Sequence, residues 1–216
     1  MDDNKETEGV IKYKLDFEQA PLPHPALALQ LEAWRQRLCA LGLIGGNDPA
    51  RYDGLGFGNL SHRLETGSTN FIISGTQTGH LDKMEPEDYA LVTLCDPASN
   101  TIRAQGKTAP SSEAMTHAAI YSAAPTAQAV IHVHSPEIWQ QAESLGLATT
   151  NSNIAYGTTE MAEEFARLIS SDFLDSNVIS MGGHEDGIVS WGETLDEAGE
   201  LMLQLASQAG LAERAK

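Results

Sequence analysis

Two histidines separated by a single residue are the strongest chemical signal in this chain. His132 and His134 lie in the stretch Ala129–His134, whose other residues are apolar and largely β-branched. This composition favours a β-strand, in which side chains two positions apart point to the same face. The two imidazoles would then be close enough to share one cation at the end of the strand. A buried core histidine with a second histidine nearby by chance fits the same pattern. Whether the pair binds a metal therefore depends on whether the sequence offers further ligands.

His184 is the best third ligand. It lies in the glycine-rich segment Met181–Gly187, after a strand expected at residues 177–181. Three histidines leave one coordination position open, which is typical of a catalytic rather than a structural zinc site. Considered alone, His184 fits an exposed loop histidine equally well. His117 is the rival ligand, although we interpret it as a packed histidine beside the site.

Glu113 could supply acid/base chemistry next to such a metal. It lies in the first turn of a helix expected at residues 112–124. A glutamate there is favoured by the helix dipole alone, by about 0.3–1 kcal/mol. A proton-transferring role would require a position beside the cation. Spacing alone leaves both interpretations open.

Short polar residues and glycines could form an anion site around the same helix start. Ser111 and Ser112 precede the helix, where unpaired backbone amides bind anions or are capped by hydroxyls. Gly56–Ser61 and Ser74–Gly79 have a composition that lets backbone amides approach phosphate oxygens. Each stretch alone is an ordinary turn. Neither matches a Walker loop or a GxGxxG fingerprint, so a nucleotide is not indicated.

These residues require a sheet and helices to position them. Alternating apolar residues predict an edge strand at 11–17, and apolar residues at helical spacing predict a helix over 27–41. Further strands are expected at 59–64, 71–74, 89–94, 101–104, 129–134, 177–181 and 187–191, and further helices at 112–124, 136–145, 158–170 and after Thr194. Strands in runs interrupted by helices predict a mixed sheet covered by helices. We expect an N-terminal extension over 1–20 and one domain over 21–216.

Composition limits the possible partners. The 216 residues carry 13 basic and 30 acidic side chains, a formal charge of −17, which argues against a nucleic-acid or anionic membrane surface. An anionic substrate would have to be held by local amides, hydroxyls or a metal. The first residues are too polar for a signal peptide and no apolar run approaches the ~20 residues of a membrane span. We therefore expect a cytoplasmic protein that acts on a small molecule.

Taken together and in order, the motifs closely resemble the class II aldolase/adducin family over about residues 25–210. They are Gly58-Asn59-x-Ser61, Ser74-Gly75-Thr76, Pro110-Ser111-Ser112-Glu113 with His117, His132-x-His134, Tyr156-Gly157-Thr158, and His184 before Gly187. The resemblance implies a single three-layer α/β/α domain with a mostly antiparallel central sheet. Members of the family usually form homotetramers, and they include L-fuculose-phosphate aldolases, epimerases, methylthioribulose-phosphate dehydratases and non-catalytic adducin domains.

The resemblance also implies roles for individual residues. His132, His134 and His184 would hold a divalent metal, Zn²⁺ first, with Mn²⁺, Co²⁺ or Ni²⁺ as alternatives. Glu113 would be the acid/base. Asn59, Ser74, Gly75, Ser111 and Ser112 would line the phosphate site. The expected activity is that of a lyase, an aldolase that cleaves a small phosphorylated carbonyl compound through a metal-stabilised enediolate. A sugar-phosphate dehydratase or epimerase, or an adducin-like binding module, is the alternative.

Three departures of this chain from the family pattern narrow the expected activity and substrate. Epimerase-like members carry aspartate where this chain has Glu113, which favours an aldolase or dehydratase. The connection at residues 135–155 is shorter than in the sugar-phosphate aldolases, and no tyrosine follows Tyr156. We therefore expect no counterpart of the tyrosine acids of those aldolases, which argues against fuculose phosphate as the substrate.

Overall fold

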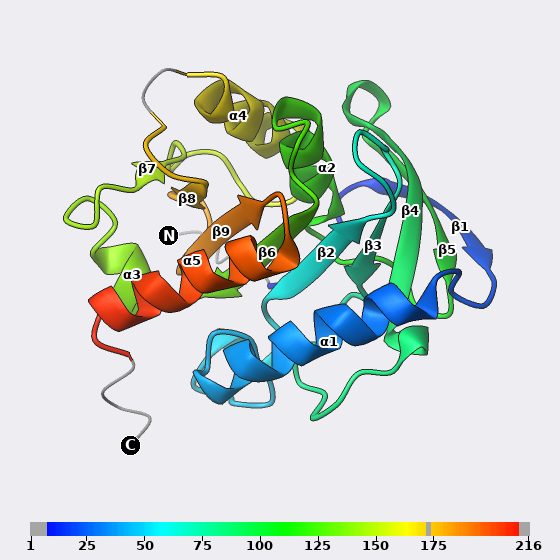
Figure 1. The fold of residues 1–216 in the computed structure, drawn as a ribbon, viewed down its shortest axis with the longest axis horizontal. Coiled ribbons are helices and arrows are strands. Elements are labelled where there is room, and N and C mark those ends of the chain that lie inside the picture. The colour runs from blue at the N-terminus through cyan, green and yellow to red at the C-terminus, as the bar shows by residue number, and fades with distance from the viewer. Residues whose placement is uncertain (1–7, 172–173, 212–216) are drawn as a thin grey trace, which may run out of the picture.

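The computed structural model describes residues 8–171 and 174–211. Residues 1–7 of the predicted extension, and residues 172–173 and 212–216 of the predicted domain, lie outside the described residues. The described strands form one nine-stranded sheet in the order β1-β5-β4-β3-β2-β6-β9-β8-β7 (Figure 1). They are β1 (Lys14–Gln19), β2 (Asn59–Arg63), β3 (Phe71–Ser74), β4 (Tyr89–Asp96), β5 (Thr101–Gly106), β6 (Ala129–His134), β7 (Ala148–Thr149), β8 (Val178–Ser180) and β9 (Gly187–Gly192).

The sheet is antiparallel in its middle and parallel at both edges. Every pairing from β5 to β8 is antiparallel, whereas β1 pairs with β5 and β7 pairs with β8 in parallel. Parallel neighbours need a long return path between them, and both edge pairs have one, since several elements intervene in the chain. The predicted mostly antiparallel sheet is confirmed, with the correction that its edges are parallel.

Helices cover both faces of the sheet. They are α1 (Pro25–Ala40), α2 (Ala114–Ala123), α3 (Pro136–Gln140), α4 (Thr159–Ile169) and α5 (Leu195–Gln208), with short turns η1 (Tyr52–Gly54), η2 (Pro86–Asp88) and η3 (Pro97–Ser99). In Figure 1, α1 and α5 lie in front of the sheet, and α2 and α4 lie together on the other side. Apolar side chains form one buried cluster on each side of the sheet. The predicted three-layer α/β/α fold is confirmed.

Strand β6 divides its side chains between these two layers. Ile131 and Val133 pack into the cluster under α1 and α5, whereas Val130 belongs to the cluster under α2 and α4. Because alternate side chains point to opposite faces, His132 and His134 lie on the α2 side. All residues of β6 are buried, as expected for a strand in the middle of a covered sheet.

Strand β7 was not predicted, and two predicted elements differ from the observed ones by more than two residues at one end. The edge strand begins at Lys14 rather than residue 11. Tyr13 lies outside the strand, and its hydroxyl donates a hydrogen bond to the carbonyl of Ser111, 2.9 Å away. Helix α3 ends at Gln140 rather than residue 145; residues 141–146 continue as turns up to Gly146, whose φ of 70° is left-handed. Neither difference moves the predicted site residues.

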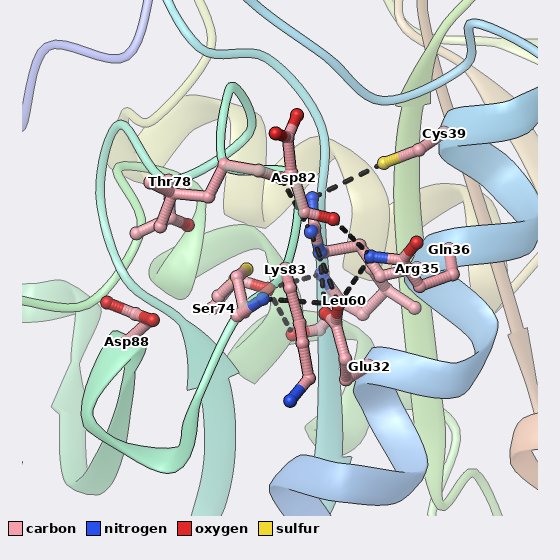
Figure 2. A network of polar contacts seen from close by, with 12 residues as sticks. Glu32, Arg35, Gln36, Cys39, Leu60, Ser74, Thr78, Asp82, Lys83 and Asp88 are labelled. Carbon is pink, nitrogen blue, oxygen red and sulfur yellow. Dashed lines mark hydrogen bonds and ion pairs between the residues drawn. The ribbon is translucent and has the colours of Figure 1, made fainter.

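A buried ion pair joins α1 to the loop after β3, as Figure 2 shows. Arg35 Nε lies 2.7 Å from Glu32 Oε2, and both side chains are almost fully buried. Arg35 Nη2 donates to the carbonyl of Leu81 at 2.7 Å, and the amide of Met84 donates to Glu32 Oε1 at 3.1 Å. These bonds fix the loop that follows Ser74, which is one of the segments predicted to bind an anion.

The Arg35→Met substitution is expected to lower the free energy of unfolding by about 3–5 kcal/mol, because it leaves Glu32 as an unpaired buried charge. Urea unfolding followed by circular dichroism measures this loss. The control is Arg103→Met, because Arg103 and Asp16 form an exposed pair with both side chains about 60% accessible; its cost should stay below about 1 kcal/mol. Equal costs for the two variants would show that the buried pair has no special role.

The cost of Arg35→Met should also depend on pH. Burial raises the pKa of Glu32, but hydrogen bonds, led by that from Arg35, lower it by more, so the net pKa falls below its ordinary 4.5. A lowered folded-state pKa stabilises the fold above the unfolded value, and that stability is lost as the pH falls through the folded pKa. The difference between Arg35→Met and the wild type should therefore shrink below pH 4.5.

Candidate active site

Three histidines converge at the C-terminal end of β6. His134 pairs with Gly187 of β9, so the turn that carries His184 lies beside this end of the strand. The Nε2 atoms of His132 and His134 are 3.1 Å apart. One ligand nitrogen from each of the three histidines lies within 4.8 Å of the others. The structure thus brings the three predicted ligands together, and metal binding by them stays a prediction.

The protonation of His132 and His134 suits a divalent metal. Burial lowers the pKa of His132 to about 4 and holds that of His134 well below its usual range, so both rings are neutral at neutral pH. His132 Nδ1 lies 3.2 Å from the carbonyl of Ile188; a proton on Nδ1 that is donated to this carbonyl would leave the Nε2 lone pair for a metal. Two such nitrogens facing each other fit a cation between them.

Two carboxylates face the third histidine. His184 Nε2 lies 2.9 Å from Glu8 Oε2, and His184 Nδ1 lies 3.5 Å from Glu113 Oε1, at ion-pair distance but without hydrogen-bond geometry. Burial lowers the pKa of His184, but Glu113 and Glu8 outweigh it and raise the pKa to about 10. Without a metal, this histidine is therefore a cation between two anions.

Glu113 is held with one oxygen aimed at the histidines. It precedes the first residue of α2 and is 1% exposed. Its Oε2 accepts a 2.8 Å hydrogen bond from Thr116, whereas its Oε1 has no hydrogen-bond partner among the described residues. Burial raises its pKa, but His184 and His132 outweigh this and lower it to about 2. The residue is an ionised carboxylate with a free acceptor facing the site.

Glycine-rich loops form a small pocket beside these groups. Its lining includes four of the five predicted phosphate residues, Asn59, Gly75, Ser111 and Ser112, together with Glu8, Gly9, Gly56, Gly58, Thr76, Gln77, Thr78 and Gly79. The loops meet because Gly75 pairs with Pro110. Close packing requires glycine at position 79, where a Cβ would lie 2.5 Å from the carbonyl oxygen of Gly45. The Asn59 side-chain oxygen is buried and finds no partner in the described part of the chain.

Ser74 differs from the other four predicted phosphate residues. Its hydroxyl accepts a hydrogen bond from the amide of Leu60 at 3.1 Å and donates to the carbonyl of Leu60 at 3.3 Å, and Ser74 does not line the pocket. Ser74 thus contacts the β2 backbone, where its hydroxyl bridges neighbouring strands. A direct phosphate contact by Ser74 has no support in this geometry.

The other histidine near the site does not join the cluster. His117 is buried, and its Nδ1 lies 2.7 Å from Ser61 Oγ, so it packs on the neighbouring strand as expected from the sequence. Glu8 was not predicted as a site residue. A single glutamate in an acidic N-terminal stretch carries no spacing signal, and only the fold brings it to the histidines.

The comparisons with known proteins assign the family. The profile described as Class II Aldolase and Adducin N-terminal domain matches residues 49–212, so the chain belongs to this family. The fold also matches an L-fuculose 1-phosphate aldolase, with a TM-score of 0.64 and 18% identity over 89% of each chain. The L-fuculose-1-phosphate aldolase from Thermus thermophilus gives a TM-score of 0.60 and 20% identity over 87% of this chain and 93% of that one.

One curated relative is a dehydratase. The methylthioribulose-1-phosphate dehydratase of Methylococcus capsulatus is 39% identical over 79 residues, which cover 37% of this chain and 34% of the relative. The match therefore spans about a third of that relative's length. Family membership, with aldolases and a dehydratase among the similar proteins, supports the predicted metal-dependent, lyase-type enzyme.

Among the described residues, no helix is both long and apolar enough to cross a bilayer.

Proposed function

We propose that this enzyme is a lyase that cleaves a carbon–carbon bond in a small phosphorylated hydroxy-carbonyl compound. The observation that carries the proposal is the meeting of three histidine nitrogens, a buried carboxylate with a free oxygen, and a glycine-lined pocket at one end of β6. Together these would supply a metal site, a proton acceptor and an anion site, which are the groups that an aldol cleavage needs.

His132, His134 and His184 would hold the divalent ion. When bound, such an ion polarises a carbonyl and its neighbouring hydroxyl. Glu113 would take the proton from the substrate hydroxyl as the carbon–carbon bond breaks, since its Oε1 is ionised and faces the histidines. It would then return a proton to carbon.

The loops beside the histidines would orient the substrate. Backbone amides and the hydroxyls of Ser111 and Ser112 line the pocket, and amides in such loops bind phosphate without a net positive field. This accounts for anion binding by a chain with a formal charge of −17. A phosphate fixed there would hold the reacting carbons near Glu113.

Dehydration of a sugar phosphate is the second candidate. It is favoured by the identity of the matched segment to the methylthioribulose-1-phosphate dehydratase. The same carboxylate would remove a proton next to the carbonyl and, as the resulting acid, give it to the hydroxyl, which would leave as water. Tyr156 is buried and packs against the His184 ring, with 4.3 Å between the ring centroids.

Product analysis separates the two reactions. The metal-loaded protein would be incubated with a panel of ketose 1-phosphates and with methylthioribulose 1-phosphate, and the products followed by NMR. We expect two carbonyl fragments from one ketose phosphate. A product lighter by one water with its carbon chain intact would replace the aldolase proposal by the dehydratase, and an inverted substrate stereocentre would indicate an epimerase.

Zinc as the ion, with Mn²⁺, Co²⁺ or Ni²⁺ as substitutes, is part of the same proposal because imidazole suits all four. A homotetramer, a cytoplasmic location and a role in carbohydrate metabolism are likewise proposed on the family resemblance. Metal analysis and light scattering of the purified protein test the first two.

A further inference from the structure

The segment before β1 crosses the candidate active site. Residues 8–13, here termed the N-terminal strap, begin beside the anion pocket and end where Tyr13 bonds to the carbonyl of Ser111. On the way, the amide of Val10 donates to the Tyr156 hydroxyl at 3.1 Å, and Thr76 Oγ1 donates to the carbonyl of Gly9 at 3.3 Å. The strap is thus held by specific contacts at several points.

The strap carries a carboxylate to the point on which the histidines converge. Glu8 Oε2 lies 2.9 Å from His184 Nε2 and 3.8 Å from His134 Nε2, and the side chain is 11% exposed. A carboxylate oxygen is a common fourth donor for a divalent ion held by imidazoles. Glu8 therefore stands where the open coordination position of a three-histidine site would be.

The strap also closes the anion pocket. Glu8 and Gly9 form part of its wall, and the pocket holds about 10 Å³, room for about one water. A phosphate group is several times larger, so it enters only if the wall moves. The backbone carbonyls of the strap beside the pocket accept long hydrogen bonds, 3.3 Å from Thr76 to Gly9 and 3.4 Å from Gln77 to Glu8. The 2.9 Å contact of the Glu8 carboxylate with His184 is therefore the shortest of these contacts that displacement would break.

We propose that Glu8 is a fourth, displaceable ligand of the ion held by the three histidines, and that the strap bearing it closes the anion pocket until a phosphorylated substrate displaces both. The proposal rests on the proposed function, because it needs an ion at the histidines and an anion in the pocket. The substrate's oxygens then replace Glu8 at the ion while its phosphate replaces Gly9 in the pocket.

A simpler role for Glu8 makes the opposite prediction. If its carboxylate only pairs with protonated His184 in the metal-free protein, it competes with the ion. Removal of its charge would then raise metal affinity. If Glu8 is a ligand, the same change lowers metal affinity. The sign of the effect therefore distinguishes the two.

The first experiment measures Co²⁺ affinity against a chelator and the visible spectrum of the cobalt-loaded protein. The Glu8→Gln variant is expected to bind Co²⁺ about 10²-fold more weakly, the share of one ligand among four, and to show a shifted cobalt spectrum. The control is Glu18→Gln, which removes the same charge from an exposed position on β1 and should change neither. Unchanged or raised affinity in Glu8→Gln would overturn the proposal.

The second experiment titrates inorganic phosphate into the same cobalt-loaded proteins by calorimetry. Because strap and phosphate compete, Glu8→Gln should bind phosphate at least about 5-fold more tightly than the wild type, the lower end of typical coupling between two ligands. Equal phosphate affinity would refute the closure. If Glu8→Gln alone behaves like the wild type in both titrations, only this inference fails. If the wild type binds no cobalt, the proposed function fails with it.

Discussion

Glu113→Gln is expected to lower turnover by roughly 10²- to 10⁴-fold, the contribution of a positioned acid/base, while metal content stays the same. Glutamine keeps the shape of the side chain and an oxygen that can accept from Thr116, which lies 2.8 Å from Glu113 Oε2. It removes the charge and the proton-accepting oxygen that face His184. Steady-state kinetics on the substrate found by product analysis, with metal content measured in parallel, checks this.

The matched control is Glu160→Gln. Glu160 lies in the first turn of α4, on the surface, and Glu113 is the residue just before the first turn of α2. If first-turn glutamates matter only through the helix dipole, worth about 0.3–1 kcal/mol, the two substitutions should have similar small effects on stability and none on turnover. Glu113 makes no side-chain cap to the α2 backbone, which already argues against a purely structural role. Full turnover in Glu113→Gln would assign the proton transfer to another group.

The histidine site could be predicted because its geometry follows from local rules. Alternation in a strand places His132 and His134 on one face, whatever the rest of the fold does. His184 required one further step, that β9 pairs with β6 so that Gly187 lies opposite His134. That pairing was not predicted from the sequence; His184 was chosen because it lies in a glycine-rich turn after an expected strand.

The parts that could not be predicted depend on distant contacts. Glu8 is far from His184 in the chain, and nothing in its neighbourhood marks it. In α1 the apolar spacing pointed to an inner stripe that includes Leu31 and Leu38, but Glu32 and Arg35 are buried there too. Their burial depends on the carbonyl of Leu81 and the amide of Met84, and helical periodicity carries no information about such partners.

The anion pocket shows an intermediate case. Composition identified the right loops, because glycines and short hydroxyl side chains are what a backbone-lined pocket needs. It could not separate the lining residues from their supports. Ser74 and Gly75 are neighbours, yet Gly75 lines the pocket and the Ser74 hydroxyl bonds to Leu60. Adjacent residues along a strand point to opposite faces. Whether Ser74 or Gly75 reaches the pocket therefore depends on how β3 is oriented where it ends.

Replacement of a single predicted ligand should strongly weaken metal binding. Binding free energies of about 10–16 kcal/mol shared among four ligands correspond to roughly 3 kcal/mol each, so His134→Ala or His184→Ala should weaken Zn²⁺ binding by about 10²-fold or more. Elemental analysis of purified protein and competition with a chelator measure the loss. Circular dichroism shows whether the variants remain folded.

His117→Gln is the decisive companion, because His117 is the other buried histidine near the site. Its Nδ1 lies 2.7 Å from Ser61 Oγ, and it is not part of the cluster of converging ligands found among the described residues. The variant should therefore keep its zinc while His134→Ala and His184→Ala lose theirs. The reverse pattern, with zinc lost in His117→Gln and kept in His184→Ala, would move the third ligand from the β8–β9 turn to α2. Glu113, in the turn just before His117, would then be adjacent to a ligand on its own helix, and its proposed role in proton transfer would have to be derived again.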